Sequence, residues 1–168
     1  YTYTEPTIYM EIASECGRLA RENGLANVFV SNGYMSSETI DYCMDFLDAI
    51  NVDLKAFTNE FYRDMCKASL KPVLETLKKI AATDIWLEVT TLVIPGLNDS
   101  DDELKQIAGF NANELGPHVP WHVSRYHPTF KRTTGGPTPS EALVNAYQIG
   151  KDAGLHYVYV GNIPGCNY

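Results

Sequence analysis

The chain has 168 residues, of which 45% are hydrophobic and 20% are charged, as expected for one globular domain with a core of its own. A net charge of −8 and a pI near 4.9 argue against a nucleic-acid-binding surface. No apolar run is long enough to cross a membrane and no signal peptide is visible. The four scattered cysteines favour a reduced, cytoplasmic protein and offer no metal site by their spacing.

Strand-like and helix-like patterns alternate along the whole chain. In order, we expect strand 1–4, helix 7–23, strand 26–31, helix 36–47, strand 51–55, helix 58–82 with a break near Pro72, strand 85–94, helix 100–115, strand 121–128, helix 140–153 and strand 156–160. Ser100 and Glu103 form a capping box at the start of their helix. Six strands alternating with five helices predict an α/β fold with a parallel sheet. Neither a glycine-rich phosphate loop nor a nucleophile elbow follows a strand, so a barrel is favoured over an open dinucleotide-binding sheet.

The two ends of the chain look cut. Residue 1 is a tyrosine within what looks like the end of a strand, and the chain finishes at Cys166-Asn167-Tyr168 directly after a turn. We therefore expect residues 1–168 to be a single domain taken from a longer protein.

The segment Asn51-Val52-Asp53-Leu54-Lys55 is the most informative part of the sequence. Alternation along a strand points Asp53 and Lys55 to the same face, with Leu54 opposite. A plain ion pair that closes a strand is one explanation. The other is that both side chains lie at the mouth of a barrel, where residues at the carboxyl ends of strands bind and react.

Other polar side chains follow the remaining strands. His127 before Pro128 and Glu5 before Pro6 each have an ordinary explanation, as a loop histidine and as a carboxylate at a helix start. Their convergence at one end of the sheet is the stronger argument, because the combination suits a zwitterionic small molecule. The expected set is Tyr3, Thr4, Glu5, Ser31, Asn32, Asp53, Lys55, Glu88, Thr90, Leu92, Arg125 and His127.

Five short motifs occur in a characteristic order: Thr4-Glu5-Pro6, Ser31-Asn32-Gly33, Asp53-Leu54-Lys55, Val93-Ile94-Pro95-Gly96-Leu97-Asn98-Asp99 and His127-Pro128. Together they resemble the radical SAM superfamily, and within it the activating enzymes of pyruvate formate-lyase type, which implies a partial (β/α)6 TIM-like barrel. The resemblance covers essentially the whole chain, and the sequence is most similar to the radical SAM enzymes of the AmmeMemoRadiSam system. The resemblance rests on Tyr1-Thr2-Tyr3-Thr4-Glu5-Pro6-Thr7, Ser31-Asn32-Gly33, Asp53-Leu54-Lys55, Val89-Thr90-Thr91-Leu92-Val93-Ile94-Pro95-Gly96-Leu97-Asn98-Asp99, Trp121-His122-Val123-Ser124-Arg125-Tyr126-His127-Pro128 and Tyr157-Val158-Tyr159-Val160-Gly161-Asn162.

The resemblance implies a site for S-adenosylmethionine (SAM). Tyr3, Thr4 and Glu5 match a Gly-Gly-Glu motif that meets the methionine amino group. Ser31 and Asn32 match a strand end that contacts the methionine part of SAM. Asp53 and Lys55 match an Asp-Leu-Lys motif whose lysine reaches the SAM carboxylate. His127 matches a residue at the ribose and adenine, and Leu92 matches an apolar residue at the adenine. No residue is expected to act as a proton-transfer catalyst or as a metal ligand.

The resemblance also implies chemistry that these residues alone cannot perform. Radical SAM enzymes hold a [4Fe-4S] cluster on a CxxxCxxC loop, take an electron from a donor such as flavodoxin or ferredoxin, and cleave SAM to a 5′-deoxyadenosyl radical. That cysteine motif is absent here. We expect the motif upstream of Tyr1, which would make this chain the C-terminal portion of a radical SAM core. The radical's substrate is not fixed, and a glycine of a partner protein is one candidate.

Two further points qualify the resemblance. Thr4 stands where glycine is usual, and Val30 stands where the activating enzymes carry an aspartate that helps to bind a monovalent cation, so we expect no such cation.

Two alternative functions stay open. One is a barrel lyase or aldolase that uses Lys55 as a Schiff-base amine, although the nearby Asp53 would raise the lysine pKa. The other is a non-catalytic domain that binds SAM or a partner.

Overall fold

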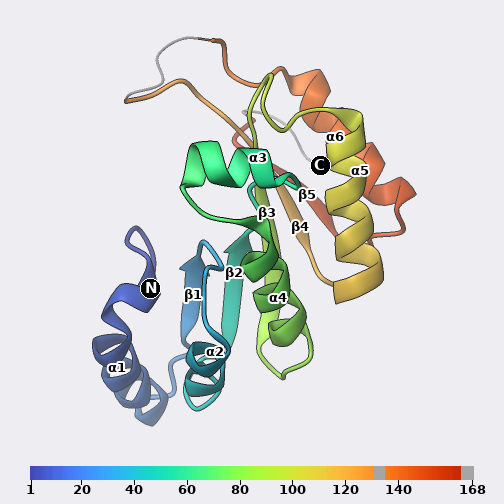
Figure 1. Cartoon of the computed structure of the whole chain (residues 1–168). Coiled ribbons are helices and arrows are strands. Elements are labelled where there is room, and N and C mark those ends of the chain that lie inside the picture. Colours follow the sequence, from blue (N-terminus) through green and yellow to red (C-terminus); the bar gives the residue numbers. More distant parts are fainter. Residues whose placement is uncertain (131–134, 164–168) are drawn as a thin grey trace. The chain divides into compact units, whose positions relative to one another are not determined.

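The computed structural model describes residues 1–130 and 135–163 (Figure 1). Its five strands form a parallel sheet in the order β1-β2-β3-β4-β5, with helices in the connections. The predicted α/β class with a parallel sheet is therefore confirmed. The chain divides into two compact units. The first unit consists of Tyr1–Asp53 and Lys71–Glu88, and the second unit consists of Leu54–Leu70 and Val89–Tyr168. Within the described ranges, no helix is long and apolar enough to span a membrane.

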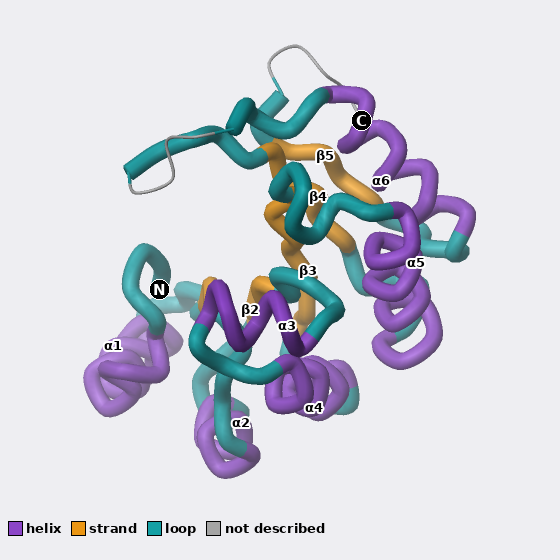
Figure 2. The backbone as a smooth tube through the Cα atoms, turned by 45° about the horizontal axis from the view of Figure 1, so that its top comes forward, coloured by secondary structure: helices purple, strands orange, loops and turns teal. Residues whose placement is uncertain are grey.

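The first unit packs small helical residues against an aromatic core. Phe29 is fully buried, and its ring lies 5.2 Å from that of Tyr1 and 5.9 Å from that of Phe46. Gly17 lets α1 approach closely, since a Cβ there would lie 2.5 Å from Phe46 Cδ2. In Figure 2 the helices lie in a row below β1 and β2. The elements are the 3-10 turn Pro6–Tyr9, α1 Met10–Glu22, β1 Val28–Ser31, α2 Ser37–Cys43, β2 Ala49–Asp53, α4 Leu70–Ala81 and the start of β3 Trp86–Val93.

The second unit is built around Trp121, which is fully buried on β4. Trp121 pairs with Val89 of β3 and with Val158 of β5 in the parallel register. A Cβ on Gly150 would lie 2.9 Å from Val158 Cγ2, so this glycine allows α6 to pack closely on the strands. The elements are α3 Asn59–Phe61, the π-turn Tyr62–Cys66, the rest of β3, α5 Asp101–Phe110, the π-turn Asn111–Leu115, β4 Trp121–Arg125, α6 Ser140–Asp152 and β5 Val158–Gly161.

Some predicted boundaries are wrong for identifiable reasons. Residues 1–4 form no strand, although Tyr1 alone makes two backbone hydrogen bonds to β1, its N to Val28 O at 2.7 Å and its O to Val30 N at 3.0 Å. Strand β2 ends at Asp53, so Lys55 lies beyond the strand. The helix after Ser36 ends at Cys43, not at Leu47.

Only one of the two hydrogen bonds of the predicted capping box is found at the start of α5. Ser100 Oγ accepts a hydrogen bond from Glu103 N at 3.3 Å, which confirms the N-cap. The Glu103 carboxylate does not complete the capping box. It accepts a hydrogen bond from Phe57 N at 2.7 Å and thereby ties the loop after β2 to α5. The predicted helix 58–82 is interrupted before Pro72, as expected, since α4 begins at Leu70. The part before this break contains the π-turn Tyr62–Cys66, whose backbone turns are wider than those of an α-helix.

Candidate functional site

Glu5 joins the start of the chain to the end of β1. Its Oε1 accepts hydrogen bonds from Ser31 Oγ at 2.8 Å and from Thr7 Oγ1 at 3.2 Å. Its Oε2 accepts a hydrogen bond from Asn32 N at 2.8 Å. Three predicted site residues, Glu5, Ser31 and Asn32, therefore come together in the first unit.

A rigid turn after β1 aims the Asn32 amide at that carboxylate. Asn32 Oδ1 accepts from Tyr34 N at 2.8 Å, and the Ser31 hydroxyl accepts from Gly33 N at 3.0 Å. Gly33 has φ 71°, in the left-handed region that favours glycine, and a Cβ there would lie 2.6 Å from Val52 Cγ1. The turn is thus fixed by local hydrogen bonds and by contact with β2.

Four further predicted residues belong to the first unit: Tyr3, Thr4, Asp53 and Glu88, whose Oε1 accepts a hydrogen bond from Trp86 Nε1 at 3.0 Å. Tyr3 is fully exposed and has φ 68°, a conformation that glycine adopts readily, which suits a position where the resemblance implies glycine. Thr4 is also exposed. Asp53 is half-buried at the end of β2, one residue beyond Val52, which pairs with Ser31.

In the second unit, Asn98 links two predicted residues. Its Nδ2 donates to Lys55 O at 2.6 Å and to Leu92 O at 2.9 Å. Lys55 is half-buried, and the Leu92 side chain is 39% exposed. Burial raises the pKa of the Cys66 thiol, and the positive charge of Lys55 lowers it to a smaller extent.

Other predicted residues of the second unit are placed less specifically. His127 is exposed, two residues beyond the end of β4. Next to it, Tyr126 N donates to Thr138 Oγ1 at 3.0 Å. Arg125 contacts the same threonine, since its Nε donates a hydrogen bond to Thr138 O at 2.7 Å. The adenine-side roles of His127 and Leu92 stay predictions.

Sequence reasoning missed three residues around Lys55: Tyr62, Thr91 and Asn98. Each hydrogen-bonds a backbone group of Leu54 or Lys55. Thr91 and Asn98 lie in the segment Val89 to Asp99 that carries the resemblance, but the sequence assigns neither of them a role in the site. The available signal was the polar Thr91 on the buried face of β3 between Val89 and Val93, but this pattern does not reveal which backbone group Thr91 holds.

The described residues do not fit an iron–sulfur cluster. Across 1–130 and 135–163, no three His, Cys, Asp or Glu side chains gather as a metal site. Cys16, Cys43 and Cys66 belong to α1, α2 and the π-turn of the second unit. Burial raises the pKa of Cys43 to about 11, which disfavours the thiolate that a metal needs. Cys166 lies outside the described residues.

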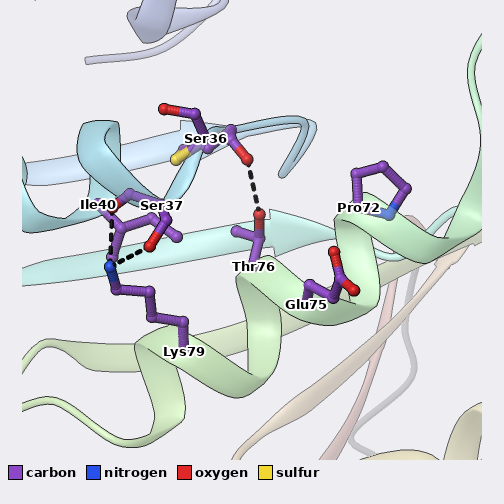
Figure 3. A pocket seen from close by; sticks show the side chains of 8 residues that line it. Ser36, Ser37, Ile40, Pro72, Glu75, Thr76 and Lys79 are labelled. Atoms are coloured by element: carbon purple, nitrogen blue, oxygen red, sulfur yellow. Dashed lines mark hydrogen bonds between the residues drawn. The ribbon is translucent and has the colours of Figure 1, made fainter.

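A cavity of about 370 Å³ lies between α2 and α4 in the first unit (Figure 3). Lys79 Nζ donates to Ser37 O at 2.8 Å and to Ser37 Oγ at 2.6 Å, and it pairs with the Asp41 carboxylate. Thr76 Oγ1 donates to Met35 O at 3.4 Å. None of the residues that line this cavity is a predicted site residue, and the bonds of Lys79 and Thr76 explain its polar groups as helix packing.

A family match decides the identity of the fold. The model of the Radical SAM superfamily matches residues 1–108 of the chain. The chain belongs to the radical SAM superfamily. The predicted resemblance is thereby confirmed, including its direction within the superfamily, since activating enzymes are among the relatives.

Relatives and solved structures agree with this assignment. An uncharacterized protein of Methanocaldococcus jannaschii is 46% identical over 165 residues, which cover 98% of this chain and 49% of that protein. Pyruvate formate-lyase 1-activating enzyme of Escherichia coli is 23% identical over 125 residues, 73% of this chain and 50% of the enzyme. The crystal structure of a domain of pyruvate-formate lyase-activating enzyme from Bacteroides vulgatus has a TM-score of 0.81 and 20% identity, covering 96% of this chain and 97% of that domain. This radical SAM chain thus spans about half the length of the curated relatives it matches.

Proposed function

We propose that this chain is the SAM-binding part of a radical SAM enzyme of the activating type. The observation that carries the proposal is the joining of Glu5, Ser31 and Asn32 at the end of β1, three residues to which the resemblance gives roles at the methionine part of SAM. Membership of the superfamily and the activating-enzyme relatives support it.

The residues present suit the two charged ends of a methionine moiety. Glu5 is half-buried, and its Oε1 accepts hydrogen bonds from Thr7 N, Thr7 Oγ1 and Ser31 Oγ. Its Oε2 accepts one from Asn32 N, and since each carboxylate oxygen has two lone pairs, Oε2 can also receive an ammonium donor. In the second unit, Lys55 supplies an ammonium for the carboxylate of the ligand. In this proposal Leu92 and His127 serve the adenosine part.

When bound, SAM supplies a sulfonium whose one-electron cleavage is the chemistry of the superfamily. Glu5 and Lys55 bind and orient the ligand and transfer no proton. An electron donor of the flavodoxin or ferredoxin class is part of the proposal. A protein substrate is also part of it, in line with the names of the activating-enzyme relatives, and the resemblance offers a glycine of that protein as the group activated. The described residues offer no cluster ligands, so the reducing centre is assigned to none of them.

Calorimetric titration with SAM tests the proposal. Lys55→Met removes the ammonium, so SAM should bind about 10- to 100-fold more weakly. Lys105→Met is the matched control, because Lys105 is an exposed lysine on α5 of the same unit, and its affinity should equal that of the wild type. Absence of SAM binding to the wild-type protein, or equal affinity in the Lys55→Met variant, would contradict the proposal.

A further inference from the structure

Three consecutive backbone groups at Lys55 are each held by a different side chain. Leu54 O accepts a hydrogen bond from Thr91 Oγ1 at 2.9 Å. Lys55 N donates to the Tyr62 hydroxyl at 3.2 Å. Lys55 O accepts from Asn98 Nδ2 at 2.6 Å. We call Thr91, Tyr62 and Asn98 the Lys55 clamp.

The clamp is part of the core of the second unit. Thr91 and Asn98 are 0% exposed and Tyr62 is 2% exposed. Thr91 Oγ1 also accepts from Trp121 Nε1 at 3.0 Å. Asn98 Oδ1 accepts from Ile94 N at 2.6 Å, while its Nδ2 also bonds Leu92 O. The three side chains therefore cannot move without disturbing buried partners.

This arrangement exceeds what the end of a strand requires. Beyond Asp53 the chain has left β2, and a half-buried loop residue can satisfy its backbone groups with water. Here, both the N–H and the C=O of one residue are bonded to buried side chains from two separate segments, the π-turn and the turn after β3. Bonds on both sides of one Cα restrict φ and ψ of that residue and so fix the base of its side chain.

We infer that Tyr62, Thr91 and Asn98 are positioning residues that hold the Lys55 backbone so that its ammonium meets the carboxylate of a bound ligand. The inference rests on the proposed function and extends it to residues that do not touch the ligand. A fixed backbone lowers the entropy lost when the lysine pairs with an anion, since the loop is already ordered before binding.

Tyr62→Phe is the sharpest test, because it removes one hydroxyl and keeps the buried ring. We expect SAM to bind roughly three- to tenfold more weakly to this variant. Binding of 5′-methylthioadenosine, which has no carboxylate, should be unchanged. Tyr147→Phe on α6 is the matched control and should leave both affinities unchanged.

A double-mutant cycle separates positioning from general damage. Once Lys55→Met has removed the ammonium, adding Tyr62→Phe should weaken SAM binding no further. Asn98→Ala, with a thermal melt to verify folding, should weaken SAM binding more than Tyr62→Phe and should show the same dependence on Lys55. If that variant does not fold, the Tyr62→Phe cycle decides alone.

The outcomes distinguish the two proposals. If the wild-type protein fails to bind SAM, the proposed function is overturned and the inference with it. If Lys55→Met weakens binding while Tyr62→Phe leaves SAM affinity unchanged, or weakens SAM and 5′-methylthioadenosine equally, the proposed function stands and the positioning role is overturned.

Discussion

The Glu5 region and the Lys55 region fix their charged residues in opposite ways. In the first unit the Glu5 side chain itself makes the structural bonds, accepting from Thr7, Ser31 and Asn32. In the second unit the structural bonds go to the Lys55 backbone. Replacing a side chain that makes the structural hydrogen bonds removes those bonds and lowers stability. Replacing a side chain whose backbone accepts and donates the structural bonds leaves these bonds in place. The comparison therefore predicts that fold and binding are coupled at Glu5 and separable at Lys55.

The largest expected effect is on stability at Glu5. Glu5→Ala removes a charged acceptor from Ser31 and Asn32 and should lower the free energy of unfolding by about 2 kcal/mol. Lys55→Met should lower it by less, because the bonds from Tyr62 and Asn98 go to backbone groups that methionine keeps. Urea denaturation of both variants measures the difference, with Glu11→Ala on the exposed side of α1 as the control. Equal losses for Glu5→Ala and Lys55→Met would break the comparison.

An intermediate effect concerns Asp48, a second carboxylate of the first unit that holds backbone. Hydrogen bonds from Asn27 N at 2.6 Å and from Arg21 lower the pKa of Asp48 below its usual value. A lowered pKa contributes stability that is present above about pH 4, the value in the unfolded chain, and is lost as pH falls through the lower folded value.

Asp48→Asn should therefore reduce the loss of stability on acidification below about pH 4. Denaturant midpoints measured from pH 6 down to pH 2.5 give the slope. The slope of the wild type should be steeper than that of the variant. Identical slopes would show that the carboxylate does not act through these bonds.

The smallest expected effect is at Cys66. Burial raises the pKa of this thiol, and the Lys55 ammonium opposes that rise. Lys55→Met should raise the pKa further and slow alkylation of Cys66 by about twofold at pH 8. Mass spectrometry of the Cys66 peptide, with exposed Cys16 as the internal reference, measures the rate. Faster alkylation in the variant would show that the ammonium does not reach this thiol.

Much of the fold could be predicted because it depends on local patterns. The apolar pattern 85–94 gives β3, and Ser100 caps α5 as expected. The end of β2 could not be predicted, because Asp53 and Lys55 alternate as strand residues do. In the structure the strand ends at Asp53, and the N–H and C=O of Lys55 are bonded to the buried side chains of Tyr62 and Asn98.

The candidate site shows the same division. Glu5, Ser31 and Asn32 were predicted from motif resemblance, and the structure joins them. Tyr62, Thr91 and Asn98 were not predicted, because their partners are backbone groups, which no spacing of residue types reveals, and those of Thr91 and Asn98 lie 37 and 43 residues away in sequence. Charged residues that contact ligands are visible in a sequence, whereas the residues that support them are visible only in three dimensions.

Gly33 has a consequence for sequence tolerance. Its φ of 71° disfavours every L side chain, and the 2.6 Å approach to Val52 excludes even alanine without a shift of β2. In a library randomised at residues 33 and 34, folded clones should return glycine almost alone at 33, while the exposed Tyr34 accepts many residues. The information content of this turn is therefore concentrated in one position that has no side chain.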